Sequence, residues 1–600
     1  MRSSTENPAP TSPALTLNAE ELQTLPGSRG GEPFSVIGVL PGVTTPIPLL
    51  PIYVVRGSSV GMSGYLLDGM RLPQLFHLVV GGGVVHRRLI DHMDFYPSAY
   101  GAAFGRTAGA VAAAETRPAR DGYHGEVQVR LFDVSALAEA TLPGDVRVVA
   151  AGSYGYPGPL LKAIAGLDLN YWDYALRADW RGFMLEAIGS YDSVTVPKSS
   201  NVDGKPVQFD DELRLAFHHL QLRYRGRRGA PSGKGEPVRS TVIDYEAALV
   251  GGYDEMRIFG GAGVRKLFAG ARASLKARLR RLQVAAGLDG ELARFTEGGL
   301  PTADRLPDTL GELAGARDGL VGGAYAEGTL ELVPGELLVT LGARVDAYHS
   351  RGLTVVGFDP RLSLRYMPTG WLTLRSGLGL YQQPPSFPVP LPGIDTFALR
   401  LGLQRALHAA LGQELTLPFG LTLGATGFYQ RFQNSNDVVL DLAPLVCTSP
   451  PPESLTGYLA RVTRQVDGAS FGMELMLRRK AGLVSNRGAG AALAISGWLA
   501  YTLSRSERAF ACGLAPADYD QTHVLNAVVQ VRLPWRLMVG GRLFAQRDLA
   551  ERAERPEAEE AAQRPLDPSG TPPQRITASG FQKLAHQFIV AEAVEGPALW

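Results

Sequence analysis

Strict alternation between apolar and polar residues is the sequence feature that most constrains this chain. It recurs in roughly eighteen segments between residues 124 and 546. In residues 339–347 the odd positions carry Val, Leu, Ala, Val and Ala, whereas the even positions carry Thr, Gly, Arg and Asp. Segments 372–380, 471–478 and 525–532 repeat the pattern. Because successive side chains of a strand point to opposite faces, we predict a mostly β chain whose strands each have one apolar and one polar face.

Strand length and loop length separate the two β architectures that alternation allows, a soluble sandwich and a membrane-spanning barrel. The segments run to ~10 or more residues, as tilted membrane strands require, whereas strands of globular proteins average ~5–6. Short turns at 417–420 and 533–536 alternate with longer polar loops at 433–458 and 504–522. Such asymmetry between the two ends is typical of outer-membrane barrels. We therefore expect a large antiparallel transmembrane β-barrel over residues 124–546.

Composition excludes several other classes of protein. No run of ~18 consecutive apolar residues occurs, which excludes a helical membrane protein. The 59 Lys and Arg residues against 58 Asp and Glu leave a net charge of +1, so no global field attracts nucleic acid. Glycine makes up 71 of 600 residues and only 20% are charged, which suits one large β architecture better than a series of soluble domains.

Motifs for catalysis and for metal binding are missing from the sequence. The GGG at 81–83 lacks the rest of a phosphate-binding loop. His218 and His219 are adjacent and would point to opposite faces of a strand, so they cannot share a metal ion. No nucleophile motif such as G-x-S-x-G occurs. We therefore expect no enzyme activity, no metal site and no cofactor.

Cys447 and Cys512 are the two cysteines of the chain. Counting strands from the short turn at 417–420 to the short turn at 533–536 places both cysteines in long loops at the same end of the barrel. In an oxidising compartment they could form a disulfide, and the alternative is a pair of unrelated free thiols. Both interpretations stay open.

An ordered series of stretches carries a resemblance to a known family. The stretches are TLNAEELQTLPG (16–27), VIGVLPGV (36–43), VVRG (54–57), YLLDGMRLPQLFH (65–77) and IDHMDFYPSAYGAAFGRTAGAVAAAETR (90–117). In this order they resemble the plug domain of TonB-dependent outer-membrane receptors. Three later stretches are similar to barrel segments of that family: YQQPPSFPVPLPG (381–393), YTLSRSERAF (501–510) and DYDQTHVLNAVVQVRLP (518–534).

The resemblance implies a plug domain at residues 16–120 inside the lumen of a barrel of ~22 strands. It implies a protein of the outer membrane, surrounded by lipid, that binds a small extracellular ligand. An energised TonB complex would then pull on the plug and import the ligand. Iron chelates, cobalamin, sugars and peptides are all carried by such receptors, so the type of ligand stays open.

The same resemblance nominates individual residues. Those that correspond to strands and turns of the plug are Arg56, Gly57, Asp68, Gly69, Tyr100, Gly101, Gly105 and Gly109. Separately, the polar face of the strands nominates inward-pointing residues that would line the lumen: Arg344, Asp346, Arg375 and Tyr381. Residues 16–22 are expected to begin a helix, with Asn18 as its N-cap.

Both ends of the chain depart from the family pattern. Residues 1–15 are expected to be disordered, and neither a signal peptide nor a TonB-binding segment is recognisable before the plug. Residues 547–600 form a charged non-barrel tail, with nine charges in the seventeen residues 547–563, as a frameshift would produce. The barrel is therefore expected to be incomplete. The alternative function is a structural or adhesive barrel without transport, or a truncated receptor without function.

Overall fold

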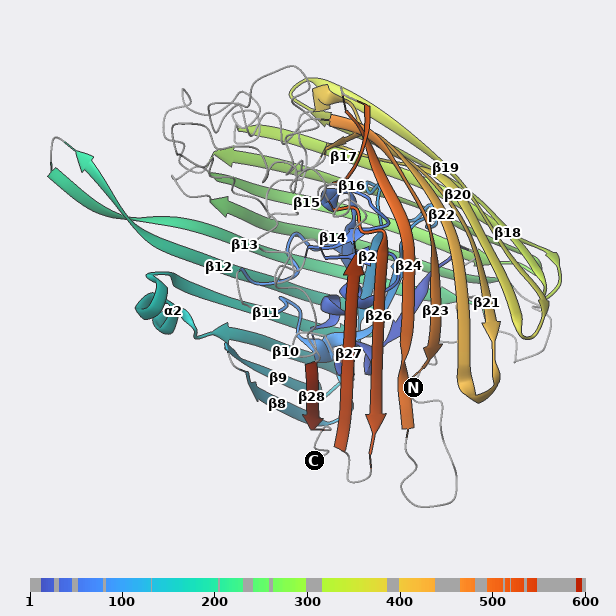
Figure 1. Ribbon diagram of the computed structural model, residues 1–600, viewed down its shortest axis with the longest axis horizontal. Coiled ribbons are helices and arrows are strands. Elements are labelled where there is room, and N and C mark those ends of the chain that lie inside the picture. Colours follow the sequence, from blue (N-terminus) through green and yellow to red (C-terminus); the bar gives the residue numbers. More distant parts are fainter. Residues whose placement is uncertain are drawn as a thin grey trace, which may run out of the picture.

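The computed structural model describes most of the chain as a plug inside a β-barrel (Figure 1). The described residues are 12–25, 32–45, 52–78, 82–130, 132–202, 205–229, 241–257, 263–297, 316–385, 399–436, 465–480, 494–510, 513–517, 519–533, 537–547 and 590–595.

The plug is built on a mixed five-stranded sheet with the strand order β1-β6-β7-β4-β5. Its β4 and β7 are parallel, whereas the other neighbours are antiparallel. The strands are β1 (Leu15–Asn18), β4 (Gly64–Leu67), β5 (Met70–Arg71), β6 (Ile90–Tyr96) and β7 (Val111–Thr116), with a separate pair β2 (Val43–Thr44) and β3 (Val54–Val55). The helices are α1 (Ala19–Thr24) and the short 3-10 helices η2 (Pro33–Val39), η3 (Val60–Met62) and η4 (Arg87–Leu89).

A long antiparallel sheet surrounds the plug. Its consecutive strands pair along the chain, and β24 also pairs with β26. The strands are β8 (Tyr123–Val129), β9 (Asp133–Leu142), β10 (Val146–Gly155), β11 (Asp168–Trp180), β12 (Phe183–Val202), β13 (Lys205–Arg228), β14 (Val242–Arg257), β15 (Gly263–Arg278), β16 (Leu282–Glu297), β17 (Arg317–Val333), β18 (Leu337–Ser350), β19 (Leu353–Thr369), β20 (Leu372–Gln383), β21 (Gln404–Thr416), β22 (Leu421–Asn436), β23 (Gln465–Arg479), β24 (Ala494–Phe510), β25 (Gly513–Pro516), β26 (His523–Arg532), β27 (Leu537–Arg547) and β28 (Val590–Glu595). Between them lie α2 (Gly158–Ala165), η6 (Leu399–Leu401) and η7 (Pro418–Gly420).

The seam of the barrel lies between its last and first strands. The strand order brings β28 next to β8. β28 pairs with β27 from Leu537↔Glu595 to Arg542↔Val590, but the described residues give no residue-by-residue register between β28 and β8. The strand order therefore places the last strand beside the first. Residues 590–595 belong to the sheet, although the sequence pattern placed all of 547–600 outside it.

Two groups of aromatic rings lie on the outward face of the barrel at different levels. Trp172 stacks on Tyr191 near one level, with ring centroids 5.7 Å apart, and Phe183 packs against Tyr224 near the other, at 4.6 Å. The eight residue-to-residue steps from Trp172 to Trp180 of β11 rise ~26 Å along the strand, or roughly 20 Å along the barrel axis after tilt. This is comparable with the apolar band of ~25 Å between the aromatic girdles of outer-membrane barrels. Outward side chains between the girdles are apolar, including exposed Leu176, Leu220, Leu222 and Leu249.

The two ends of the barrel differ in their connections. Short turns at 143–145, 181–182, 334–336 and 370–371 lie at one end. The opposite end carries most of the longer connections, such as 156–167, together with the two-residue turn at 351–352, and we call it the long-loop end. There the β12–β13 hairpin projects past its neighbours (Figure 1). No helix in the described part of the chain is long and apolar enough to cross a membrane.

Candidate functional site

The Arg56–Gly57 turn ties the plug to the wall. Both residues adopt positive φ angles, 48° and 66°, which a glycine adopts readily and an arginine only at a cost of roughly 1–2 kcal/mol. The turn directs the buried Arg56 guanidinium at β23. There Nε donates to Glu474 Oε1 and Nη2 to Glu474 Oε2, both at 2.7 Å. Such a two-pronged, desolvated ion pair is geometrically specific.

The Asp68–Gly69 turn has the same backbone form, with φ angles of 50° and 81°. The buried Asp68 carboxylate accepts hydrogen bonds from Thr116 N (3.2 Å) and from Arg223 Nη1 of β13 (2.9 Å). A side chain at position 69 would meet Arg272 of β15, whose Cζ lies 2.9 Å from an ideal Cβ. Glycine here permits Arg272 to reach Asp68, where Nη2 donates to the backbone oxygen at 2.7 Å.

The remaining plug residues nominated by the sequence lie between 100 and 109. The Tyr100 ring is buried against the Tyr381 ring, with centroids 4.4 Å apart. A Cβ at Gly101 would lie 2.8 Å from Glu327 Oε2, and one at Gly105 would collide with the Arg344 guanidinium. Gly109 packs on Met62 with similarly little room. These glycines let the plug backbone approach inward side chains of the wall.

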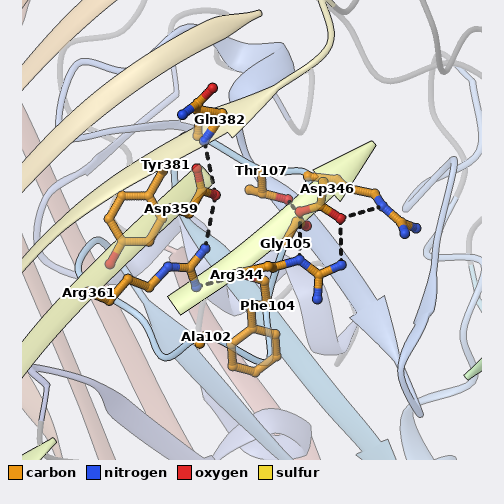
Figure 2. A network of polar contacts seen from close by, with 12 residues as sticks. Ala102, Phe104, Gly105, Thr107, Arg344, Asp346, Asp359, Arg361, Tyr381 and Gln382 are labelled. Atoms are coloured by element: carbon orange, nitrogen blue, oxygen red, sulfur yellow. Dashed lines mark hydrogen bonds and ion pairs between the residues drawn. The ribbon is translucent and has the colours of Figure 1, made fainter. Parts of the chain in front are cut away.

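All four residues expected in the lumen lie on the inward face of their strands, and Figure 2 shows three of them, Arg344, Asp346 and Tyr381. Arg344 Nε donates to Asp346 Oδ2 at 2.7 Å, and both side chains face the plug segment around Gly105. Tyr381 donates from its hydroxyl to Tyr100 O at 3.0 Å. Arg375 lies apart from this group, nearer the short-turn end, where it pairs with Glu414 at 2.8 Å and is half-buried.

Two further residues of this network were missed by the sequence reasoning. Arg361 of β19 donates from Nη1 to Phe104 O at 2.7 Å and lies over the Tyr381 ring, 4.4 Å from its centroid. Asp359 accepts from Gln382 N at 3.3 Å (Figure 2). Positions 359 and 361 fall on one face of an alternating strand, so the pattern that nominated Arg344 could have found them.

A cavity of about 420 Å³ separates the plug from strands β14 to β18. Its lining reaches Ser350 and Leu399 at the long-loop end and Arg272 midway along β15. Aromatic side chains contribute much of its wall: Tyr65, Phe104, Phe268, Phe295, Tyr325 and Tyr348. The cavity is therefore a vestibule between plug and barrel that combines aromatic surface with charge.

Arg71 is the cation of this cavity that stands out by its partners. Lys266 pairs with Glu291 at 2.9 Å and Arg272 with Glu246 at 3.2 Å. Arg71 is exposed, and the hydrogen bonds described for it go to Arg106 O (2.8 Å) and to a threonine hydroxyl. No described carboxylate forms an ion pair with Arg71, so its charge is available to an anionic group entering the cavity.

On another face of the plug, His77 lies between two carboxylates of the wall. Nδ1 is 3.1 Å from Asp192 Oδ2, and Nε2 is 3.1 Å from Asp173 Oδ2. Burial lowers the pKa of His77, but the two carboxylates outweigh it and raise the pKa from 6.5 to about 10. His77 is thus a cation at neutral pH and fastens the plug to β11 and β12.

Across the described residues, no cluster of three His, Cys, Asp or Glu side chains is arranged to hold a metal ion.

The two cysteines lie outside the described residues, so their pairing stays a prediction. The strands that lead toward them end at Asn436 and Phe510. Both strands run in the same direction, because β23 pairs antiparallel with each of them.

No protein-family model matches this sequence, and neither does any curated protein. Solved structures do share its fold. The alcaligin outer-membrane receptor FauA of Bordetella pertussis is 14% identical, with 90% of this chain and 88% of that chain covered and a TM-score of 0.57. The ferric enterobactin receptor PfeA of Pseudomonas aeruginosa is 14% identical, with 89% of this chain and 86% of that chain covered and a TM-score of 0.58. The FrpB iron transporter of Neisseria meningitidis is 12% identical, with 88% of this chain and 86% of that chain covered and a TM-score of 0.59.

These likenesses extend over both the plug and the barrel, at identities low enough to speak for the fold alone. They agree with the ordered plug stretches and the alternating strands of the sequence. The chain therefore has the plugged-barrel fold of TonB-dependent outer-membrane receptors.

Proposed function

We propose that this protein is a receptor of the outer membrane that binds a small extracellular ligand in the vestibule between plug and β14–β18 and imports it with energy from TonB. The single observation that carries the proposal is a charged, aromatic cavity of about 420 Å³ whose lining begins at the long-loop end. A volume of this size accommodates a small-molecule ligand. Transport then follows from the plug, which closes the lumen until it is displaced.

The proposed ligand is an anionic iron chelate. The structural neighbours are named as receptors or transporters of alcaligin, ferric enterobactin and iron. In this chain the aromatic lining offers flat apolar surface, and Arg71 offers a charge without a carboxylate partner among the described residues. Arg344 also lines the cavity, while Asp346, which accepts from Arg106, and Tyr381 hold the plug beside it.

Uptake of radiolabelled ferric citrate and ferric enterobactin tests the proposal in cells that lack their own receptors for these chelates. We expect uptake of at least one chelate that disappears when TonB is deleted. Arg71→Gln should weaken binding of that chelate about tenfold, because it removes a charge-assisted contact. Arg147→Gln is the matched control, since Arg147 pairs with Asp121 far from the cavity lining.

The outcomes separate this proposal from a barrel without transport. Binding without TonB-dependent uptake would favour a structural or adhesive barrel. Failure of both chelates to bind would overturn the iron-chelate assignment.

A further inference from the structure

The plug packs against one part of the wall through apolar side chains. Its largest apolar cluster, which includes Leu17, Ile37 and Phe95, continues without interruption into side chains of the barrel. Those side chains are Leu137, Val149, Ile188, Phe217, Trp498 and Val528, from strands β9, β10, β12, β13, β24 and β26. Separating plug from wall here would expose apolar surface to water.

A second apolar contact holds the plug to β20, β21 and β22. Met62 and Tyr100 of the plug share a buried cluster with Tyr381 and Phe432. Ala99 shares another with Ala410 and Phe428. The Ser59 hydroxyl also meets the Ser435 hydroxyl at 2.7 Å on this side.

The contacts with β15 to β19 are of a different kind. Within the described part of the chain, no buried apolar cluster joins the plug to these strands. The plug is held there by polar contacts, such as Ala102 N donating to Glu327 Oε2 at 2.8 Å and Arg361 Nη1 donating to Phe104 O at 2.7 Å. The vestibule already separates plug and wall along much of this face. When plug and wall separate, water can form hydrogen bonds to each group of these polar contacts, whereas it offers no equivalent partner to the apolar side chains.

We propose that the plug opens along β15–β19, so that the ligand descends between the plug and this part of the wall while the plug stays packed on β9–β13 and β20–β26. This inference rests on the proposed import function and adds the route to it. Along that route the Gly105 backbone closes against Arg344, because the guanidinium occupies the space in which a Cβ would stand.

Two disulfide staples test the route. A102C/G342C joins the plug to β18, where an ideal Cβ at position 342 lies 3.1 Å from Ala102 Cβ. S59C/S435C joins the plug to β22, where the two hydroxyl oxygens lie 2.7 Å apart. Both are placed in a C447S/C512S background, and mass spectrometry verifies that each staple closes. Each reduced variant serves as the control for its own oxidised form.

The measured quantity is K⁺ and Cl⁻ conductance of the full chain in planar lipid bilayers at sub-denaturing urea, where the part of the plug with the smallest opening free energy opens first. Oxidising A102C/G342C should lower this conductance at least about fivefold, whereas oxidising S59C/S435C should change it less than about twofold. The reverse order, or equal loss in both, would overturn the route. Neither ligand nor TonB enters this measurement, so failure of the import proposal shows only in the uptake assay.

Hydrogen exchange of the unsubstituted chain, followed by mass spectrometry, covers the case in which a stapled variant does not fold. Amides of residues 101–107 should exchange at least about tenfold faster than those of residues 34–40, which lie in the largest apolar cluster. Equal or slower exchange of residues 101–107 would refute the proposal.

Discussion

The ion pair between Arg56 and Glu474 gives a direct measure of how strongly the plug is fastened to the barrel. The side chains are only 1% and 6% exposed, and the guanidinium makes both of its forked contacts at 2.7 Å. Glu474→Ala leaves a buried cation whose described polar partner is the Ser98 hydroxyl. Loss of one member of a buried pair costs about 3–5 kcal/mol, so we expect a destabilisation of that size.

A double-mutant cycle isolates the pair itself. With Arg56→Ala added, the stranded charge disappears, so the double variant should be more stable than the sum of the two single effects predicts, by roughly 2 kcal/mol. The assay is urea unfolding in detergent micelles, followed by near-ultraviolet circular dichroism of the plug aromatics. Arg294→Ala is the control, because its ion pair with Asp318 is 72% and 74% exposed and should contribute nothing measurable. Additive single effects, or a cost of Glu474→Ala below about 1 kcal/mol, would refute the reasoning.

Three further predictions concern other parts of the molecule. Gly105→Val should displace Arg344 and destabilise the plug by about 1–3 kcal/mol in the same urea titration, whereas an unchanged midpoint would contradict the close approach. The pKa of His77, raised to about 10, stabilises the folded protein, and this stabilisation is fully present below pH 6.5 and is lost as the pH rises through 10. Between these values the free energy of unfolding should fall by up to about 1.4 kcal/mol per pH unit, and the His77→Gln variant should lose this pH dependence in calorimetry. Cys447 and Cys512 should form a disulfide in oxidised protein, which would stabilise the folded state by roughly 4 kcal/mol in the chain-entropy model. Alkylation of both thiols without reductant would show that they are free.

The alternating pattern by itself predicts most of the fold. It assigns Arg344 and Asp346 to the inward face of β18, because a strand repeats every two residues whatever surrounds it, and both side chains are buried in the lumen. Asn18 is also confirmed as a helix N-cap, with its side chain accepting from Glu21 N at 2.9 Å. The expectation of helix for the residues before it is wrong, because Leu15–Asn18 form a strand.

Contacts between distant segments account for what the sequence could not reveal. Leu15 pairs with Phe95, and this pairing across the plug overrides the local preference for helix. The partner of Arg56 lies 418 residues further along the chain. Nothing in either local pattern specifies that pair, since it depends on the depth at which the plug sits. The vestibule likewise depends on how distant segments meet, because it is the space that remains between the plug and strands β14 to β18.

The plug also spans the seam between the last and the first strands of the barrel. The plug touches the wall on both sides of that joint: Arg542 of β27 donates to Gly38 O at 3.4 Å, and Arg117 pairs with Glu139 of β9 at 2.6 Å. The plug thus links the last strands of the wall to the first through its own contacts, in addition to the pairing within the sheet. Removal of the plug would take away both of these links, so that strand pairing alone would then hold the last strands of the wall to the first.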